Sequence, residues 1–336
     1  MSRYQMTMET METMETMETM ETMETRTLEE KLRGLVHSWG MSTFSERIAL
    51  QWIERFLGSD DDCDAFGRLR KWIVLQLNHR RMPEDCSKWQ LGCPELIPML
   101  RAIPVWNCSE FSWVKTLESN FEVIKEELLA LKSRPKSGFQ PYRAPSWASD
   151  INAKDGLGSA GHDAGDWNVL YLFLHNVDFQ TNRDLCPRTA AIIESIDGQY
   201  EHAFFSALAP QTHVKKHHGP TNKKLRCHLP LVVPEGQSHL RAGDEVVYAR
   251  EGKCFIFDDS FEHEAWNDDD THSRIVLIID IWHPDLTTQE RKFLGFLRNA
   301  RLRMDKTMSQ NSGDNFYSII KKAGEDHASS PNAVWS

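Results

Sequence analysis

Residues 213–233 read HVKKHHGPTNKKLRCHLPLVV, and the second half of this stretch, Leu225–Val233, has the pattern of a β-strand. Arg226 and His228 are separated by apolar residues, so the two-residue period of a strand puts both on one face and the apolar residues on the other. In a small barrel an inward-facing Arg and His are costly to bury unless an anion pairs with them. The stretch therefore predicts a strand with one apolar and one charged face inside a closed β structure.

Short apolar runs of strand length recur on both sides of this stretch. They are separated by turn residues such as Pro234-Glu235-Gly236 and Glu251-Gly252. Several short strands at close spacing favour an antiparallel barrel or a double-sheet jelly roll, as in cupins. The candidate strands are Val169–Phe173, Ala203–Leu208, Leu225–Val233, Glu245–Arg250, Cys254–Phe257 and Ile275–Trp282.

The part of the chain before these strands is helical in pattern. Apolar residues recur at three- and four-residue steps from Thr27 to about Leu57, over Phe66–Leu77 and over Phe111–Leu131. We therefore predict an α+β fold: a double-stranded β-helix (jelly-roll, cupin-like) core with packed N-terminal and flanking helices. The expected organisation is a disordered, low-complexity Met-Glu-Thr tail at 1–26, a helical region at 27–135, the jelly roll at 136–290 and a polar helical tail at 291–336. Pro135 to Ala164, rich in Pro, Ser, Gly and Ala, is expected to be a long surface loop.

Composition excludes several classes of protein. The formal charge of −10 argues against a nucleic-acid or anionic-membrane partner, since both favour a basic surface. No apolar run approaches the roughly 20 residues that span a bilayer, and the N-terminus lacks the pattern of a secretory signal. Seven cysteines without a C-x-x-C pair predict neither a disulfide framework nor a cysteine zinc site. We expect a cytoplasmic protein with reduced thiols.

Two histidines, His217 and His263, are candidate ligands of a non-haem iron. The usual site of this kind has two histidines and one carboxylate, the first two ligands forming a His-x-Asp/Glu motif. Here Gly219 stands at the carboxylate position. Arg274, at the start of an apolar strand, suits recognition of a carboxylate, because a guanidinium binds a carboxylate through two parallel hydrogen bonds.

Four motifs together are closely similar to the catalytic domain of the aspartyl/asparaginyl β-hydroxylase family of 2-oxoglutarate oxygenases. They are H-x-G-P-T-N at 217–222, L-R-x-H-L at 225–229, F-D-D-S-F-E-H-E at 257–264 and D-x-W-H-P-x-L at 280–286. A weaker resemblance covers about 94–289. The resemblance to this family implies a dioxygenase that uses iron(II), 2-oxoglutarate and O₂ to hydroxylate an unactivated C–H. The best substrate hypothesis is the β-carbon of Asp or Asn in a peptide or protein.

The resemblance also implies a role for individual residues. His217 and His263 would bind iron(II), and water replaces the missing carboxylate in this family, so Gly219 fits the pattern. Asp259 would accept a hydrogen bond from metal-bound water. The residues implied for 2-oxoglutarate are Arg274 and Ser206 at its distal carboxylate, Arg226 and His228 at the carboxylate near the metal, and Trp167 in the wall of the pocket.

Some features leave the substrate and the reaction open. Lys224 stands where the family resemblance leads us to expect an arginine, and we interpret it as a solvated lysine. A small molecule or a lipid could replace the peptide substrate. Gly219 leaves room for chloride, as in a halogenase. A non-catalytic module that only binds 2-oxoglutarate is the remaining alternative.

Overall fold

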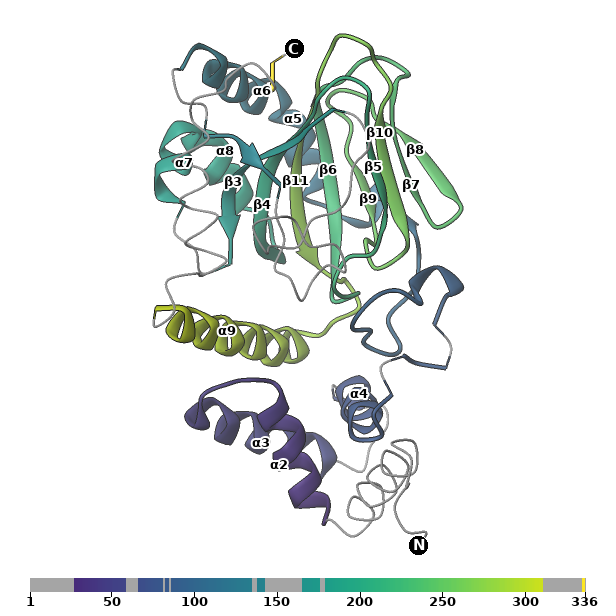
Figure 1. The fold of residues 1–336 in the computed structure, drawn as a ribbon, viewed down its shortest axis with the longest axis vertical. Helices are drawn as coiled ribbons and strands as arrows, with labels where there is room; N and C mark the ends of the chain where they lie inside the picture. The colour runs from purple at the N-terminus through teal and green to yellow at the C-terminus, as the bar shows by residue number, and fades with distance from the viewer. Residues whose placement is uncertain are drawn as a thin grey trace, which may run out of the picture.

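The computed structural model describes residues 27–58, 66–80, 82–84, 86–134, 138–142, 165–175, 179–310 and 334–335. The predicted tail at 1–26 and most of the predicted loop at 135–164 lie outside the described residues. Two β-sheets face each other, and helices cover one sheet and one end of the molecule (Figure 1). This confirms the predicted α+β, jelly-roll fold.

In the described part of the chain the larger sheet has seven strands in the order β1-β9-β6-β11-β4-β3-β2, and every pair is antiparallel. All the apolar runs predicted as strands form this sheet except Glu245–Arg250. Its strands are β1 Val105–Trp106, β2 Gln140–Pro141, β3 Trp167–Leu174, β4 Gln199–Leu208, β6 Lys224–Val232, β9 Phe255–Phe257 and β11 Arg274–Trp282.

The smaller sheet has the order β5-β10-β7-β8 and is also antiparallel. The sequence pattern predicted one of its strands, β8, whereas the other three are short and carry few apolar residues, so their pattern is weak. Its strands are β5 Thr212–His217, β7 Ser238–Ala242, β8 Glu245–Tyr248 and β10 His263–Asn267.

The predicted helical stretch from Thr27 to Leu57 is two helices rather than one. Thr27 begins the first with a capping box, in which its hydroxyl accepts from the Glu30 amide and the Glu30 carboxylate accepts from the Thr27 amide. Ser42 caps the second with its hydroxyl alone, which accepts from the Ser45 amide. The α-helices are α2 Leu28–Ser38, α3 Thr43–Leu57, α4 Gly67–Leu77, α5 Val114–Ser119, α6 Phe121–Ala130, α7 Gln180–Leu185, α8 Pro187–Glu194 and α9 Thr288–Gln310, with short 3₁₀ turns η1 Lys88–Gln90, η2 Cys108–Glu110 and η3 Leu131–Ser133.

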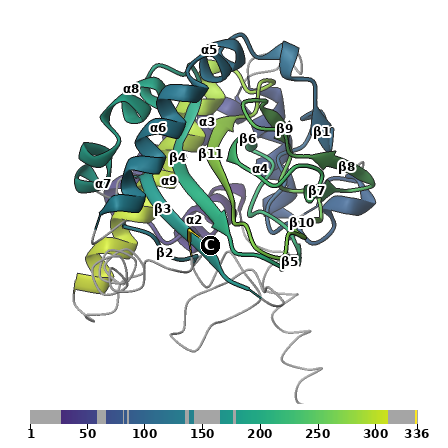
Figure 2. The same cartoon turned by 90° about the horizontal axis from the view of Figure 1, so that it is seen from above.

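The larger sheet separates two apolar cores. On its outer face Leu225, Cys227 and Leu229 pack with residues of α5, α6 and α8, the helices that cover this face in Figure 2. On its inner face Val276 and Ile278 pack against residues of the smaller sheet. The prediction that Arg226 and His228 face away from the apolar residues of their strand is therefore confirmed, and both point into the jelly roll.

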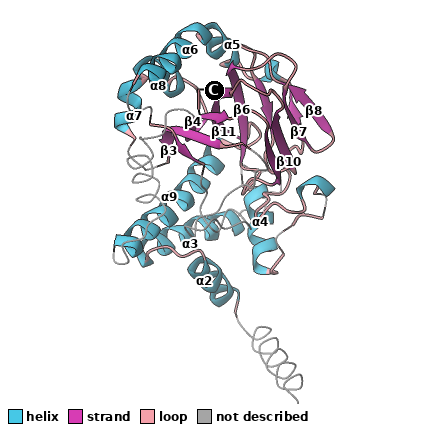
Figure 3. Ribbon diagram, turned by 45° about the horizontal axis from the view of Figure 1, so that its top comes forward, coloured by secondary structure: helices cyan, strands magenta, loops and turns pink. Residues whose placement is uncertain are grey.

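A third core lies between the jelly roll and the N-terminal helices. There α9 packs on α3, with Phe293 and Phe56 in an edge-to-face contact of 4.8 Å between ring centroids. Figures 1 and 3 show α9 between the sheets and the α2–α3 pair. Among the helices that the structure describes, none has the length and apolar composition needed to cross a membrane.

Candidate functional site

His217 and His263 are directly opposed on β5 and β10, with ring centroids 4.1 Å apart. The pairing shifts between His263 and Ala265, because Ala265 pairs with Val214, so β5 carries one extra residue in this interval. Side chains alternate along a strand, and this β-bulge turns His217 to the same inner side as His263. The bulge thus creates the histidine pair.

Both imidazole rings are oriented by the backbone. Nδ1 of His217 donates to the Lys215 carbonyl at 2.7 Å, and Nδ1 of His263 donates to the Phe261 carbonyl at 2.9 Å. A carbonyl oxygen only accepts, so the proton of each neutral ring is on Nδ1 and the lone pair is on Nε2. Burial lowers the pKa of His217 and lowers that of His263 well below its ordinary value, so both are neutral at pH 7. Two such nitrogens suit a divalent metal.

The position beside the histidines where a third ligand would be expected is closed. A Cβ built on Gly219 would stand 2.5 Å from Cγ of Asp259, and the Gly219 amide donates to the Asp259 carbonyl at 2.6 Å. The space beside Gly219, in which a halogenase would hold chloride, is therefore occupied by the carboxylate of Asp259. Among the described residues no set of three or more His, Cys, Asp or Glu side chains is arranged to hold a metal.

The interpretation of Lys224 as a solvated lysine is wrong. Its side chain is 4% exposed, and Nζ lies 2.6 Å from Asp259 and 3.1 Å from Asp280. It is two residues before Arg226 on the same inner face, and a lysine there must have anionic partners. The Lys224–Asp259 ion pair holds the carboxylate against Gly219.

Arg226 is bound by Asp280, its partner on the neighbouring strand. Nε and Nη2 donate to the two carboxylate oxygens at 2.8 and 3.0 Å. Burial alone would raise the pKa of Asp280, but Arg226 and Lys224 hold it well below its ordinary range. His202 completes this cluster with a 2.8 Å contact from Nδ1 to Asp280.

A second group of side chains offers hydrogen-bond donors without acceptors. Arg274 is 2% exposed, burial lowers its pKa to about 10, and none of the described residues gives it a carboxylate partner. Its Nη2 donates to Nδ1 of His228 at 3.3 Å, so the His228 proton is on Nε2. Neither Nε of Arg274 nor Nε2 of His228 has a partner in the described part of the chain. A buried cation beside two unsatisfied donors fits a carboxylate ligand.

Ser206 and Trp167 lie on the inner face beside Arg274. The indole Nε1 of Trp167 donates to Oγ of Ser206 at 3.0 Å, and Tyr142 stacks on the indole at 3.8 Å. Ser206 pairs with Val276, two residues from Arg274 on β11. The structure thus brings Arg274, His228 and this pair to one wall, whereas Arg226 lies with Asp280.

One aromatic ring connects the two halves of the site. Phe257 packs on His228 at 5.2 Å and on His263 at 5.4 Å between ring centroids. The histidine pair and the unsatisfied donors therefore line one interior. Sequence reasoning gave no role to Phe257, His202 or Asp280. A signal for Asp280 existed, since it lies three two-residue steps from the inward-facing Arg274 on an apolar strand.

A family model described as aspartyl/asparaginyl β-hydroxylase matches residues 118–284. All the candidate residues lie within this match. The chain belongs to the aspartyl/asparaginyl β-hydroxylase family. The family membership predicted from the sequence motifs is thus confirmed.

Proteins similar to this chain have names that point to different substrates. The human aspartyl/asparaginyl β-hydroxylase is 35% identical over 237 residues, which are 67% of this chain and 28% of the human protein. An ornithine lipid ester-linked acyl 2-hydroxylase from Rhizobium tropici is 32% identical over 185 residues, 54% of this chain and 61% of that protein. The chain thus spans only part of each of these relatives.

A solved cupin domain from Schizosaccharomyces pombe covers 41% of this chain and 76% of its own, at 9% identity and a TM-score of 0.26. At this TM-score the two structures are too dissimilar to support an inference about this chain. The jelly-roll assignment rests on the two facing antiparallel sheets.

Proposed function

We propose that this chain is an iron(II)- and 2-oxoglutarate-dependent dioxygenase that hydroxylates an unactivated C–H. The observation that carries the proposal is the pairing of His217 with His263, two neutral rings whose Nε2 atoms carry lone pairs beside a wall of unsatisfied donors. When bound, iron(II) with 2-oxoglutarate and O₂ supplies the oxidising power for such a reaction.

Different side chains would bind the metal and 2-oxoglutarate. His217 and His263 would hold the metal through Nε2. Arg274 and His228 would take a carboxylate of 2-oxoglutarate, since its oxygens accept from both unsatisfied donors, with Ser206 and Trp167 beside them. Arg226, ordered by Asp280, lies along the same strand as His228 and would contact the carboxylate near the metal.

Asp259 would orient solvent at the metal. Its Oδ2 accepts from Lys224, while Oδ1 has no partner among the described residues and is left to accept from a metal-bound water. One carboxylate oxygen is thus fixed by Lys224, and the other is available to accept a hydrogen bond. The buried aromatic wall of Phe257, Trp167 and Phe255 excludes bulk water.

The proposed substrate is an Asp or Asn side chain in a peptide, hydroxylated at Cβ. The name of the human relative supports this choice. A lipid acyl chain is the second candidate, and the 32% identity to the Rhizobium tropici enzyme, 61% of whose length is matched, favours it. Halogenation receives no support, because a carboxylate fills the space beside Gly219 and would repel chloride.

The test is succinate release by the purified full chain with iron(II), O₂, 2-oxoglutarate and a pool of Asp- and Asn-containing peptides, with mass spectrometry of the peptides. Succinate with a gain of one oxygen on Asp or Asn would support the proposal in full. Succinate without a modified peptide would keep the oxygenase and move the search to lipid acyl chains and small molecules. Binding of iron and 2-oxoglutarate without turnover on any of these would favour a non-catalytic module.

A further inference from the structure

Residues 87–101, here called the bracing segment, connect the N-terminal helices to the edge strand β1. They contact residues 218–223, which follow His217 and are here called the His217 loop, and residues 258–262, which precede His263 and are here called the His263 loop. We infer that the bracing segment sets the spacing of His217 and His263, and that Asn222 is the positioning residue that fastens the His217 loop to it. The inference rests on the proposed function, because it concerns the same metal pair.

The first contact joins the two loops at a single atom. The Trp89 carbonyl accepts from the Glu262 amide at 2.6 Å and from Nε2 of His218 at 3.2 Å. Glu262 precedes His263 and His218 follows His217, so one oxygen is bound by a direct neighbour of each ligand. A displacement of this carbonyl would move both loops.

The next contacts fix each loop separately. The side-chain Nε2 of Gln90, a residue 2% exposed, donates to the hydroxyl of Ser260 at 2.8 Å, and Ser260 lies three residues before His263. At Gly92 an added Cβ would overlap the ring of His218, so the segment runs as close to this ring as a backbone can. Neither contact leaves space for either loop to shift towards the segment.

Asn222 connects the His217 loop to the backbone of the bracing segment through two hydrogen bonds. Its side-chain carbonyl accepts from the Ile97 amide at 2.8 Å, and its NH₂ donates to the Ile97 carbonyl at 3.0 Å. The Asn222 side chain is 6% exposed and thus replaces a strand partner for this backbone. Next to it Lys223 lies 2.6 Å from Glu95, and Thr221 forms a parallel bridge with Glu95.

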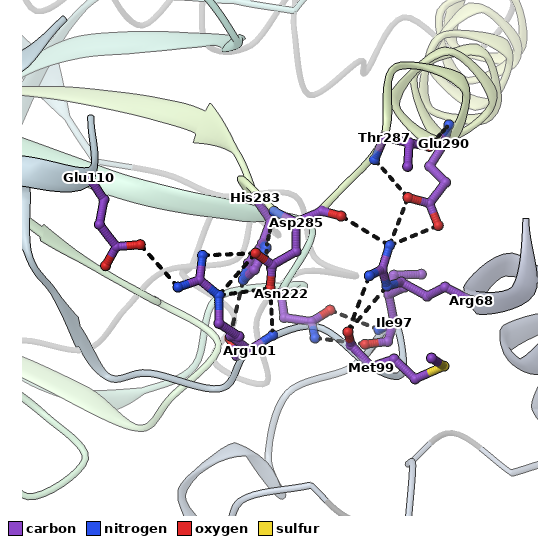
Figure 4. Close-up of polar contacts among 10 residues, drawn as sticks. All are labelled: Arg68, Ile97, Met99, Arg101, Glu110, Asn222, His283, Asp285, Thr287 and Glu290. Atoms are coloured by element: carbon purple, nitrogen blue, oxygen red, sulfur yellow. Dashed lines mark hydrogen bonds and ion pairs between the residues drawn. The ribbon is translucent and has the colours of Figure 1, made fainter. Parts of the chain in front are cut away.

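The far end of the bracing segment is anchored as well. Figure 4 shows Arg101 bound to Asp285 and to Glu110, with Arg68 of α4 reaching the Met99 carbonyl and Glu290 of α9. These ties hold the segment to the helices and to the end of β11. A segment fixed at both ends can transmit a fixed spacing to the loops that it touches.

The test is binding of Co(II), a stand-in for iron(II), to the full chain without O₂, followed by the visible absorbance of the bound metal. Asn222→Asp keeps the acceptor for the Ile97 amide and removes the donor to the Ile97 carbonyl. We expect it to weaken Co(II) binding by about 10- to 100-fold, the effect of losing a group that orients metal ligands, and to change the absorbance spectrum. Asn182→Asp is the matched control, since Asn182 donates to the Tyr171 carbonyl at 2.8 Å away from the metal pair.

A second pair of variants acts from the segment side. Gly92→Ala should weaken Co(II) binding through His218, whereas Gly34→Ala, with nothing within 4 Å of its added Cβ, should not. If Asn222→Asp and Gly92→Ala bind Co(II) with wild-type affinity and spectrum, the inference is overturned and the proposed function stands. If the wild-type chain binds neither Co(II) nor iron(II), the proposed metal site is itself overturned, which separates the two failures.

Discussion

Asp259 occupies the space in which a side chain of residue 219 would have to lie. Cγ of Asp259 is 2.5 Å from the position of a Cβ on Gly219, and Lys224 holds the carboxylate there through a 2.6 Å ion pair. The glycine and the aspartate are therefore coupled, because the space that a side chain at position 219 would need is taken by the carboxylate of Asp259. A second carboxylate, on a side chain at position 219, cannot fit beside Asp259 unless the surrounding residues move.

Gly219→Asp should consequently fail to build a three-residue metal site. We expect a loss of about 1–3 kcal/mol in the free energy of unfolding from overpacking, and no gain in Co(II) affinity. Chemical denaturation and Co(II) titration measure the two effects. Gly34→Asp, at an exposed helix position with nothing within 4 Å of its Cβ, is the control. Tighter Co(II) binding by Gly219→Asp would show that Asp259 yields the space.

His217→Ala and His263→Ala should each reduce succinate formation and Co(II) binding to background. With two protein ligands, the loss of either leaves a single imidazole, too few to retain the metal. His213→Ala is the control, since His213 lies on the same strand and contacts Glu264 and Trp266 instead. Retained turnover in either ligand variant would refute the assignment.

Arg274→Met should remove the response to 2-oxoglutarate while sparing the free protein. A buried guanidinium without a carboxylate partner contributes no ion pair, so an apolar side chain of similar length should leave stability equal or higher. Loss of charged hydrogen bonds worth about 1.5–3 kcal/mol should weaken 2-oxoglutarate binding by about 10- to 100-fold. Thermal unfolding with and without 2-oxoglutarate measures both, and exposed Arg47→Met is the control. An unchanged thermal shift in Arg274→Met would place the ligand elsewhere.

Lys224→Met should strongly destabilise the fold. It leaves Asp259 and Asp280 buried with less positive charge, and breaking a buried pair costs about 3–5 kcal/mol. The free energy of unfolding in urea gives the magnitude. Exposed Lys292→Met should change it by less than about 0.5 kcal/mol. Equal stability of the two variants would contradict the buried network.

Asp258 should make the stability of the protein depend on pH. Burial raises its pKa from 3.8 to about 7, so between these values the folded state keeps a proton that the unfolded state has lost. The stabilisation from this group is complete below the unfolded value and is lost as the pH rises through about 7. The stability of the wild type relative to Asp258→Asn should therefore fall between about pH 4 and pH 8. If the free energies of unfolding of the two proteins change with pH in the same way, the raised pKa of Asp258 is disproved. Asp244→Asn, at an exposed site, controls for the charge change.

Five of the seven strands of the larger sheet were predictable because their apolar residues form runs of strand length with a period that local sterics impose, whereas β1 and β2 are two residues long and give no such pattern. The same period correctly placed Arg226 and His228 on the inner face. The period also places Lys224 on the inner face, which contradicts its interpretation as a solvated lysine. Its partners Asp259 and Asp280 lie 35 and 56 positions further along the chain, so no local pattern reveals the pairing. The roles assigned to these side chains with metal and co-substrate stay predictions.

Sequence reasoning missed five of the strands that the structure describes, β1, β2, β5, β7 and β10, and two of them carry the candidate ligands. β5 and β10 are short and polar, and they are strands because they pair with each other and because β10 also pairs with β7 in the smaller sheet. Such non-local pairing overrides weak local preference. Motif resemblance identified the histidines without any knowledge of these strands.

The sequence by itself determined the family, the two candidate histidines and the inner face of Arg226 and His228, because motif identity and strand period are local properties of the chain. Only the tertiary structure decided that a bulge turns His217 inward, that Asp259 fills the space at Gly219, and that residues 87–101 brace both loops. Each of these depends on which distant segments meet. That is settled by the packing of the whole chain, in which most buried charges and donors find a partner.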